Sequence, residues 1–458
     1  MKKLYRFSAI ALLVLPLVFT SCSDYLDRDD DDNITEADVF ARYEKVNGLV
    51  SDVYAAAKKA DRPLVFFEHF SNSAITDECE GTNVEGNITN NFNNGAWNPN
   101  SLPGSVGQYW EALYEGIRKA NLIIENVQKY NTPDNPQQDG DLRNRIGEMY
   151  FMRGYFHMLL LRMYGEAPYI DRVINAGDNM DFKKESVHSM VEKIVTDAQT
   201  AYGMVPNKYV KTSENFGRVD KGACLGLISF VRWVAATPLW NGASQYGYNL
   251  RRVFENEYAY DATRWRKAKE AAKAVLDFEV GGTKRYSLYT KHDANDFKDP
   301  ADGNLNDSRV YARLWDMFYD MDAFANEYVF FMTKSKDQAW QGDIYPPSRE
   351  GSSRQQPVQE QVDEYEYIVG DYGYPVYSAE ARKGGYDDTN PYVKGTRDPR
   401  FYRDVIYHGA PYRNNKNESK TINTASGSDK IGATNATTTG YYLRKFQQES
   451  WNKSGNFS

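Results

Sequence analysis

The sequence is poor in the residues that most enzyme signatures need. Its 458 residues include only five histidines and three cysteines. The histidines form no HExxH spacing, and no CxxC or GxSxG motif occurs, so the standard metalloprotease, zinc-ribbon and serine-hydrolase signatures are absent. The formal net charge of −8 also lacks the basic excess of nucleic-acid-binding proteins. The sequence therefore offers no support for these enzyme and zinc-site classes or for a nucleic-acid partner, and we assign no cofactor and no metal-ligating residues, with the question of a calcium ion in the loops left open.

One apolar run, residues 7–19, opens the chain behind a cationic start. As a helix it would span roughly 20 Å, at about 1.5 Å per residue, which is too short for the ~30 Å hydrocarbon core of a membrane. Residues 1–21 are therefore predicted to be a signal peptide. The run Phe-Thr-Ser-Cys that ends at Cys22 is similar to a bacterial lipoprotein lipobox, which predicts lipidation of Cys22. Residues 22–34 would form an acidic tether, and a soluble secreted protein is the alternative.

The other two cysteines are Cys79 and Cys224. In an oxidising compartment they would be able to form a disulfide. Two buried free thiols are an equally good interpretation, and the sequence spacing does not decide between them.

Six segments are predicted to be helices. Five of them repeat their apolar residues at spacings of three and four, and the segment at about residues 141–164 is apolar on nearly all sides, so it should be packed on more than one side. The six segments cover approximately residues 35–62, 108–130, 141–164, 186–205, 221–237 and 262–278, and the first begins with a Thr35–Asp38 capping box. Each apolar face must be buried against a neighbour, so we expect consecutive antiparallel pairs. The prediction is a mainly α fold, a tetratricopeptide-like helical-hairpin solenoid with inserted loops over residues 35–280.

From residue 281 the helical period fades and Gly, Pro, Asn, Asp and Tyr dominate. Only scattered strand-like pieces remain, such as residues 328–333. Residues 281–458 are therefore predicted to be an irregular, loop-rich lobe of the same fold. Residues 63–107, rich in Asn and Gly, are predicted to be a first excursion of loops, and long ordered loops are usually functional.

The candidate ligand-binding residues lie in these loops. The sequence holds 35 Tyr, 22 Phe and 8 Trp. Aromatic rings stack on the flat faces of sugars, and amides and carboxylates bind sugar hydroxyls. We therefore select Asp77, Asn94 and Trp97 in the first excursion, and Trp340 and Tyr345 in the irregular lobe.

Several motifs occur in the order that is typical of one family. They are Cys22-Ser23-Asp24-Tyr25-Leu26-Asp27 with Ile34-Thr35-Glu36, Leu113-Tyr114 to Ala120-Asn121, Arg153-Gly154-Tyr155-Phe156 leading to Tyr164-Gly165-Glu166-Ala167-Pro168, Gly217-Arg218-Val219, Arg397-Asp398-Pro399-Arg400-Phe401, and Thr439-Gly440-Tyr441-Tyr442-Leu443-Arg444-Lys445-Phe446. The chain therefore resembles the SusD/RagB family, surface glycan-binding lipoproteins of the Bacteroidetes. The motifs themselves are expected to be structural. We expect Arg153 to pair with a buried carboxylate or carbonyls, and residues 397–400 to form a turn with charge pairing.

The resemblance implies a SusD-like fold and a function without bond cleavage. The protein would be a lid that captures oligosaccharides and delivers them to a SusC-like TonB-dependent transporter. It would be anchored by lipid to the outer membrane and exposed at the cell surface. The family usually continues past the last motif into another helical pair, so the resemblance also implies a C-terminally truncated chain without its final repeat.

Three other functions remain open at this point. RagB-like members of the family are peptide-binding transporter lids, and the chain resembles them equally well. A glycoside hydrolase would use two carboxylates among Asp77, Glu78, Glu80 and Glu85. A purely protein-interacting helical scaffold would explain the repeats but not the lipid anchor or the aromatic loops.

Overall fold

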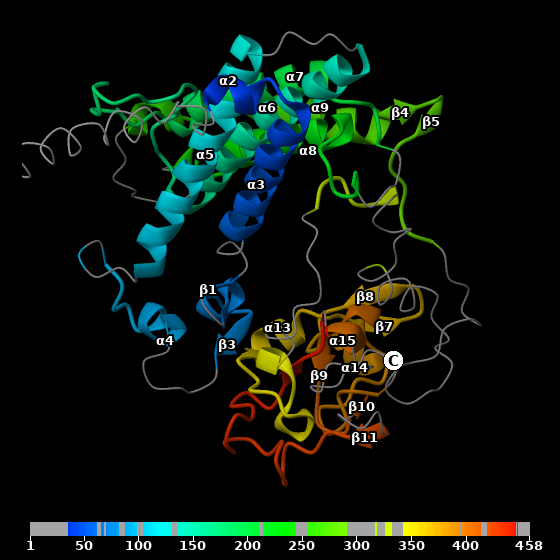
Figure 1. Ribbon diagram of the computed structural model, residues 1–458. Helices are drawn as coiled ribbons and strands as arrows, with labels where there is room; N and C mark the ends of the chain where they lie inside the picture. Colours follow the sequence, from blue (N-terminus) through cyan, green and yellow to red (C-terminus); the bar gives the residue numbers. More distant parts are fainter. Residues whose placement is uncertain are drawn as a thin grey trace, which may run out of the picture.

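The computed structural model describes residues 35–61, 66–67, 70–81, 88–98, 100, 104–130, 136–209, 214–243, 254–290, 317, 326–331, 342–393, 395–413, 419–445 and 447. Long helices form one part of the molecule, and short helices and strands form a second part below it (Figure 1). We call these parts the helical layer and the loop lobe, the latter comprising the described residues from 342 to 447. The predicted signal peptide, the tether and Cys22 lie outside the described residues.

All six predicted helical segments are helical in the structure. The elements are α2 (Glu36–Phe40), α3 (Tyr43–Asp61), α5 (Gly104–Tyr130), α6 (Pro136–Tyr164), α7 (Val187–Met204), α8 (Lys221–Ala236) and α9 (Ala262–Asp277). From α5 to α9, each helix packs against the next one along the chain, and α3 packs on both α5 and α6. This arrangement confirms the prediction of a mainly α, tetratricopeptide-like fold.

The helix boundaries follow from capping residues and from burial. Thr35 and Asp38 form the predicted capping box, and Ser186, Asp220 and Asp261 cap the starts of α7, α8 and α9. The first predicted helix is broken at Ala41, because α2 turns there and buries Phe40 in the core that α3 and α5 also supply. Helix α6 is apolar on nearly all sides, and it is enclosed by α3, α5 and α7.

Short elements fill the loop lobe. They are η7 (Pro347–Arg349), α13 (Gln359–Asp363), α14 (Ala379–Lys383), α15 (Pro399–Asp404), and the strands β6 (Gln355–Pro357), β7 (Tyr367–Val369), β8 (Tyr372–Tyr374), β9 (Val405–Ile406), β10 (Pro411–Arg413), β11 (Ser419–Thr421) and β12 (Tyr442–Leu443). The antiparallel pairs are β7 with β8, β10 with β11, and β9 with β12. The lobe has several small apolar cores instead of one large one.

The first excursion is more regular than the sequence predicts. It contains β1 (Phe66–Phe67), β2 (Phe70–Ser71), η4 (Asn72–Ile75), β3 (Cys79–Gly81) and α4 (Ile88–Asn93). Strand β3 pairs antiparallel with β6 of the loop lobe, with Glu80 opposite Gln356. The excursion therefore lies beside the lobe, below the helical layer (Figure 1). The sequence contains no pattern that predicts this pairing, because the pairing joins two short segments that are far apart in the chain.

The predicted strand at residues 328–333 is wrong over its described part, since residues 328–331 form no strand. Instead, the Phe330 ring packs on Phe151 of α6 with 4.9 Å between centroids. Val329 lies against α8, where Gly226 leaves room for it: a Cβ on Gly226 would be 2.5 Å from Val329 Cγ1. The apolar pattern of this segment reflects packing on helices.

The remaining short elements lie around α9. They are η6 (Glu255–Tyr258) before it and the hairpin of β4 (Glu279–Val280) and β5 (Thr283–Lys284) after it. In the part of the chain that the structure describes, no helix is both long enough and apolar enough to cross a membrane.

Candidate functional site

The structure places two of the selected residues in one compact feature, the turn that follows α4. Asn94, Gly95 and Ala96 donate their backbone N–H groups to the carbonyls of Asn90, Phe92 and Asn91 at 2.9, 2.9 and 2.8 Å. Gly95 adopts a φ of +70°, which a residue with a side chain rarely adopts. The chain reverses here and brings Trp97 back onto Phe92.

The two aromatic rings form a small, partly exposed surface. The Trp97 and Phe92 ring centroids are 5.1 Å apart, and the rings meet edge to face at 88°. Trp97 is half-buried on Ile75, Val106 and Tyr109, whereas Phe92 is 40% exposed. An aromatic surface that packs on other side chains on one side and is partly exposed to solvent is suited to stacking on the flat apolar face of a ligand.

Polar residues lie close to this surface along the chain. Asn94 is exposed beside the rings, and Asn93 Nδ2 donates to the Ala74 carbonyl at 3.1 Å, which ties α4 to η4. The exposed Asp77 follows η4 directly, two residues after the Ile75 that supports Trp97. We call Phe92, Asn94 and Trp97, with the adjoining Asp77, the Phe92–Trp97 patch. The sequence does not indicate Phe92 as a candidate, because only the geometry of the turn brings its ring into contact with Trp97.

The two residues selected in the irregular lobe do not join this patch. Trp340 lies outside the described residues. Tyr345 is completely buried, in a core with Ile406, Tyr412 and Tyr442, and the Arg349 guanidinium lies 4.9 Å from the centre of its ring. Its ring has no surface that a ligand can reach, so Tyr345 packs the lobe beside β6. The local sequence does not show whether a ring such as that of Tyr345 is buried or exposed.

The two remaining cysteines are buried free thiols. Burial raises the pKa of the Cys79 thiol, which lies on β3 beside the patch, to about 12, and it also raises the pKa of the Cys224 thiol. Both thiols are therefore protonated at neutral pH and are poor nucleophiles. Among the described residues, no group of three or more His, Cys, Asp and Glu side chains has a geometry suited to a metal ion.

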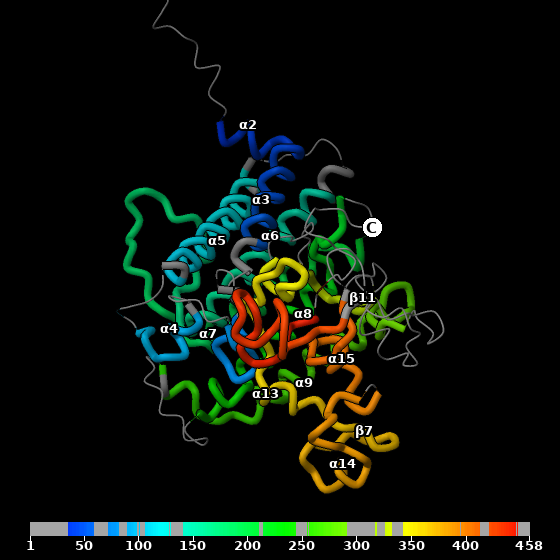
Figure 2. The backbone as a smooth tube through the Cα atoms, turned by 90° about the horizontal axis from the view of Figure 1, so that it is seen from below, coloured from blue at the N-terminus to red at the C-terminus, as the bar shows by residue number. Residues whose placement is uncertain are grey.

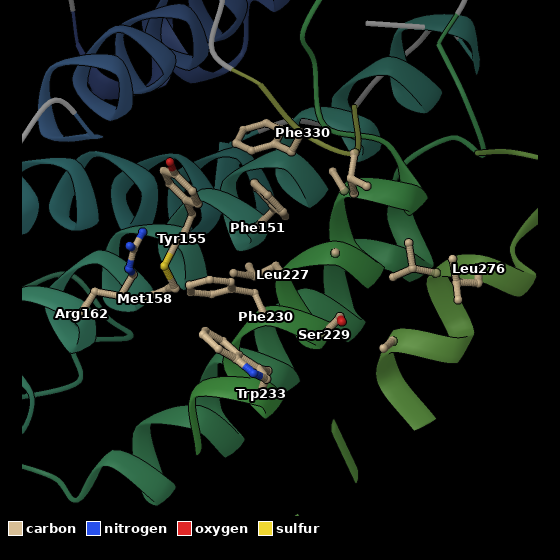
Figure 3. A pocket seen from close by; sticks show the side chains of 15 residues that line it. Phe151, Tyr155, Met158, Arg162, Leu227, Ser229, Phe230, Trp233, Leu276 and Phe330 are labelled. Atoms are coloured by element: carbon tan, nitrogen blue, oxygen red, sulfur yellow. The ribbon is translucent and has the colours of Figure 1, made fainter. Parts of the chain in front are cut away.

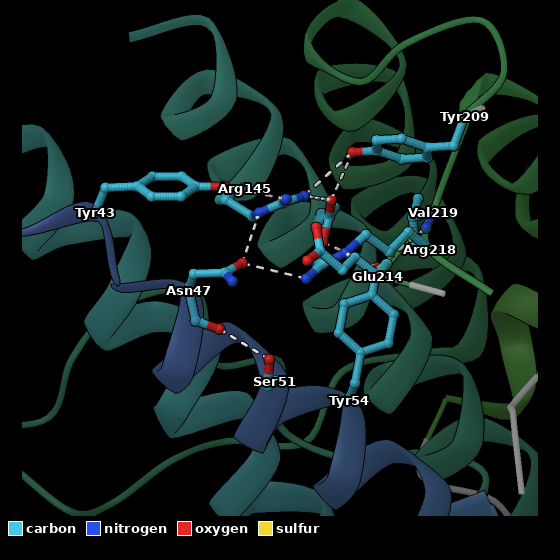
Figure 4. Close-up of polar contacts among 10 residues, drawn as sticks. Tyr43, Asn47, Ser51, Tyr54, Arg145, Tyr209, Glu214, Arg218 and Val219 are labelled. Atoms are coloured by element: carbon cyan, nitrogen blue, oxygen red, sulfur yellow. Dashed lines mark hydrogen bonds and ion pairs between the residues drawn. The ribbon is translucent and has the colours of Figure 1, made fainter. Parts of the chain in front are cut away.

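The polar groups of the helical layer are paired with one another. Glu148 is fully buried; it forms ion pairs with Arg145 at 2.5 Å and Arg218 at 2.8 Å, and it accepts hydrogen bonds from Tyr54 and Tyr209 (Figure 4). These groups come from α3, α6 and the segment between α7 and α8. The groups of this cluster are hydrogen-bonded to one another in the interior, so we assign the cluster to the scaffold.

A second buried cluster explains the Arg153 motif. As predicted, Arg153 pairs with a buried carboxylate: its Nε and Nη2 donate to Asp197 at 2.8 and 2.5 Å. Tyr169 donates to the same carboxylate at 2.6 Å. The His157 ring spans Arg153 O at 2.8 Å and the Ile170 N–H at 3.0 Å, and burial lowers its pKa to about 3. These contacts join α6, α7 and the turn after α6.

The loop-lobe motif at residues 397–400 is also structural. Asp398 caps α15 and pairs with Arg400 at 2.5 Å, which confirms the predicted charge pairing. The predicted turn is wrong, because Pro399 and Arg400 begin the short helix α15. The Arg397 guanidinium is buried and donates to the carbonyls of Val362 at 2.6 Å and Tyr365 at 2.7 Å.

The helical layer also has an apolar cavity of about 650 Å³ between α6, α8 and α9. Its walls include Tyr155, Phe230, Trp233 and Leu276, and Phe330 closes one end (Figure 3). Arg162 lies over the Phe230 ring at 5.2 Å. Sugar hydroxyls need convergent polar partners, and this lining offers few. The Phe92–Trp97 patch is therefore the better candidate for a carbohydrate.

Comparisons with known proteins agree with this fold. A family described as "Starch-binding associating with outer membrane" matches residues 24–231, and a second, described as "SusD family", matches residues 320–457. A SusD-like protein P2 from Formosa agariphila is 24% identical over 202 residues, which are 43% of this chain and 38% of that protein. The match thus spans well under half of that relative.

Solved structures extend the likeness to most of the chain. A SusD-like protein from Bacteroides fragilis superposes with a TM-score of 0.62 at 18% identity, over 92% of this chain and 71% of that one. A laminarin-binding SusD-like protein superposes with a TM-score of 0.50 at 16% identity, over 87% of this chain and 72% of that one. At these identities the structural likeness shows the fold alone.

Proposed function

The chain belongs to the SusD/RagB family, and from this premise we propose that it captures oligosaccharides and delivers them to a SusC-like TonB-dependent outer-membrane transporter without cleaving them. The observation that carries the proposal is the Phe92–Trp97 patch, which combines a supported aromatic surface with an amide and a carboxylate. Stacking and hydroxyl binding need this combination. The names of the matched relatives, starch-binding and laminarin-binding, support a carbohydrate as the ligand.

The location follows from the same premise. Lipidation at Cys22 would hold the protein on the outer membrane, and the acidic tether at residues 22–34 would separate lipid and fold. The family description of outer-membrane association supports this location. In our proposal the protein faces the cell exterior, where polysaccharides are available.

A hydrolase is less well supported than a binding protein. Of the carboxylates considered for a hydrolase, Asp77 and Glu78 are exposed, and Glu78 accepts a hydrogen bond from Ser73 Oγ at 3.0 Å. Partial burial raises the pKa of Glu80, and a hydrolase needs a pair of carboxylates. A glycosidase acid is usually shielded from water, which keeps it protonated at neutral pH.

Isothermal titration of the purified protein tests the class of ligand. The panel contains laminarin, starch, other polysaccharides and mixed oligopeptides, and each mixture is assayed afterwards for released sugar ends. We expect saturable heat with one glycan class and no release of sugar. Heat with peptides alone would replace the proposal by a peptide-binding lid. Sugar release would make the protein a hydrolase, and silence from a folded sample would refute glycan capture.

A further inference from the structure

A small unit protrudes from the edge of the loop lobe and has its own core. Strands β7 and β8 form a hairpin with three residue pairs, and α14 packs beside it. The core consists of Tyr367, Val376, Ala381 and Tyr386. Gly384 lies so close to the hairpin that an added Cβ would be 2.3 Å from Val369 Cγ2. We call this rigid feature the β7–β8–α14 unit.

Two tyrosines of this unit point into solvent. Tyr372 follows the tip of the hairpin and is 70% exposed, and Tyr377 is 56% exposed. In the part of the loop lobe that the structure describes, they are the only exposed Tyr, Phe or Trp side chains. The lobe buries or half-buries its other described aromatic rings, so exposure at these two positions is selective.

The Tyr377 ring is held in place although it is exposed. It meets the Tyr386 ring edge to face, with 6.2 Å between centroids and an angle of 89°. Partial desolvation and a hydrogen bond to Asp363 raise the pKa of Tyr377 to about 12. A ring that is already ordered loses little entropy when it binds, which favours stacking on a ligand.

The same unit carries exposed charged side chains close to the two tyrosines in the sequence. Asp371 is exposed in the hairpin turn, and Asp387 is exposed after α14. Arg382 and Asp388 form an exposed ion pair at 3.1 Å. Carboxylates accept hydrogen bonds from sugar hydroxyls and guanidinium groups donate to them, and tyrosine faces are able to pack on the C–H faces of the sugar rings.

The unit is separate from the Phe92–Trp97 patch. In Figure 2, which views the molecule from the side of the loop lobe, α4 lies at the left and β7 with α14 at the lower edge. Figure 1 likewise places α4 at the left and the hairpin at the right. A short oligosaccharide bound at the Phe92–Trp97 patch does not contact the β7–β8–α14 unit, whereas a long polysaccharide is able to contact both surfaces.

We propose that the β7–β8–α14 unit is a second carbohydrate-contacting surface, on which Tyr372 and Tyr377 stack against pyranose rings of a polysaccharide that also occupies the Phe92–Trp97 patch. The inference rests on the proposed function, since it takes the patch as the first site. A second contact on the same chain strengthens binding of long ligands, because it forms at high effective concentration.

The test compares ligands of different length. The double variant Tyr372→Ala/Tyr377→Ala is titrated with laminarin and with starch, and then with short oligosaccharides of whichever polymer binds. We expect its affinity for the polysaccharide to fall about tenfold, because two stacking contacts are removed. Its affinity for the short oligosaccharides should equal that of the unsubstituted protein.

The matched control is Tyr260→Ala, which removes a 48% exposed tyrosine from the helical layer and should bind both ligands normally. Circular dichroism of each variant establishes that it is folded, and Tyr372→Phe should retain full affinity because stacking needs only the ring. Equal polysaccharide affinity in the double variant and in the control would overturn the proposal. If short oligosaccharides lost affinity too, the tyrosines would belong to the primary site. If the unsubstituted protein bound no glycan, the proposed function would fail first and this inference with it.

Discussion

In the helical layer, charged side chains from different elements are buried together as ion pairs, whereas in the loop lobe many buried polar contacts run from a side chain to a backbone carbonyl. Glu148 lies between Arg145 and Arg218, with three elements joined at one carboxylate. In the lobe, Tyr442 donates to the Asp429 carbonyl at 2.8 Å, and Arg397 donates to the Val362 carbonyl. The helical layer is thus fixed as one body, and the lobe as several small ones.

This difference agrees with the separate roles that we propose for the helical layer and the loop lobe. A layer whose charges are satisfied internally is suited to be a scaffold. Loops with small local cores are able to carry exposed aromatic rings, such as Phe92 and Tyr372, without loss of the main core. The lobe and the first excursion, joined through β3 and β6, therefore carry the surfaces that we assign to ligand.

The largest expected effect is at Glu148. Glu148→Gln leaves the two buried arginines without their carboxylate, which should destabilise the protein by about 3–5 kcal/mol. Denaturant unfolding measures this loss. Glu192→Gln is the matched control, because it removes a carboxylate that pairs with Arg232 and Lys267 at the surface, and it should cost at most about 1 kcal/mol. Equal losses of unfolding free energy in the two variants would contradict our interpretation that the buried ion pairs of Glu148 stabilise the helical layer.

A smaller and more local effect is expected at Arg397. Arg397→Ala removes the side-chain donor of the Tyr365 carbonyl and one of the donors of the Val362 carbonyl, and it should cost about 3 kcal/mol. Hydrogen exchange should show lost protection in α13 and α15 while α6 and α7 stay protected. Arg400→Ala, which breaks an exposed pair with Asp398, serves as the control. If protection fell equally in both parts, the molecule would be one cooperative unit and our comparison would be wrong.

The third effect depends on pH and belongs to the helical layer. Folding lowers the pKa of His157 from its ordinary value near 6.5 to about 3, so the unfolded chain binds the extra proton between these values. The free energy of unfolding therefore has its full value above about pH 6.5. It decreases as the pH falls towards 3, by up to about 1.4 kcal/mol per pH unit. The pH dependence of the unfolding free energy in His157→Gln should be shallower by this amount. Parallel curves for the two proteins would show that His157 is not buried as a neutral ring.

The helices were predictable because their information is local. Apolar spacing and caps such as Asp220 mark each helix, and the structure reproduces them to within a few residues at most ends. The buried role of Arg153 was also expected, since a cation on an apolar helix needs a carboxylate. The break at Ala41 was not, because it depends on where Phe40 finds a core.

The candidate site was only partly predictable. Residue type and loop context led to Trp97 and Asn94, whose role in binding stays a prediction, and the structure places them together after the α4 turn at Gly95. Phe92 was missed, and Tyr345 was chosen although it is buried, because exposure depends on contacts between distant segments. The β3–β6 pairing is of the same kind, since three-residue strands carry no pattern of their own.

Titration calorimetry of Trp97→Ala tests the central claim most directly. The control is Trp265→Ala, which removes a 43% exposed tryptophan from α9 in the helical layer. With the glycan that the panel identifies, we predict that Trp97→Ala loses at least about tenfold in affinity while Trp265→Ala binds like the unsubstituted protein. Normal binding by a folded Trp97→Ala variant, or loss of binding in Trp265→Ala alone, would contradict the assignment of ligand capture to the Phe92–Trp97 patch.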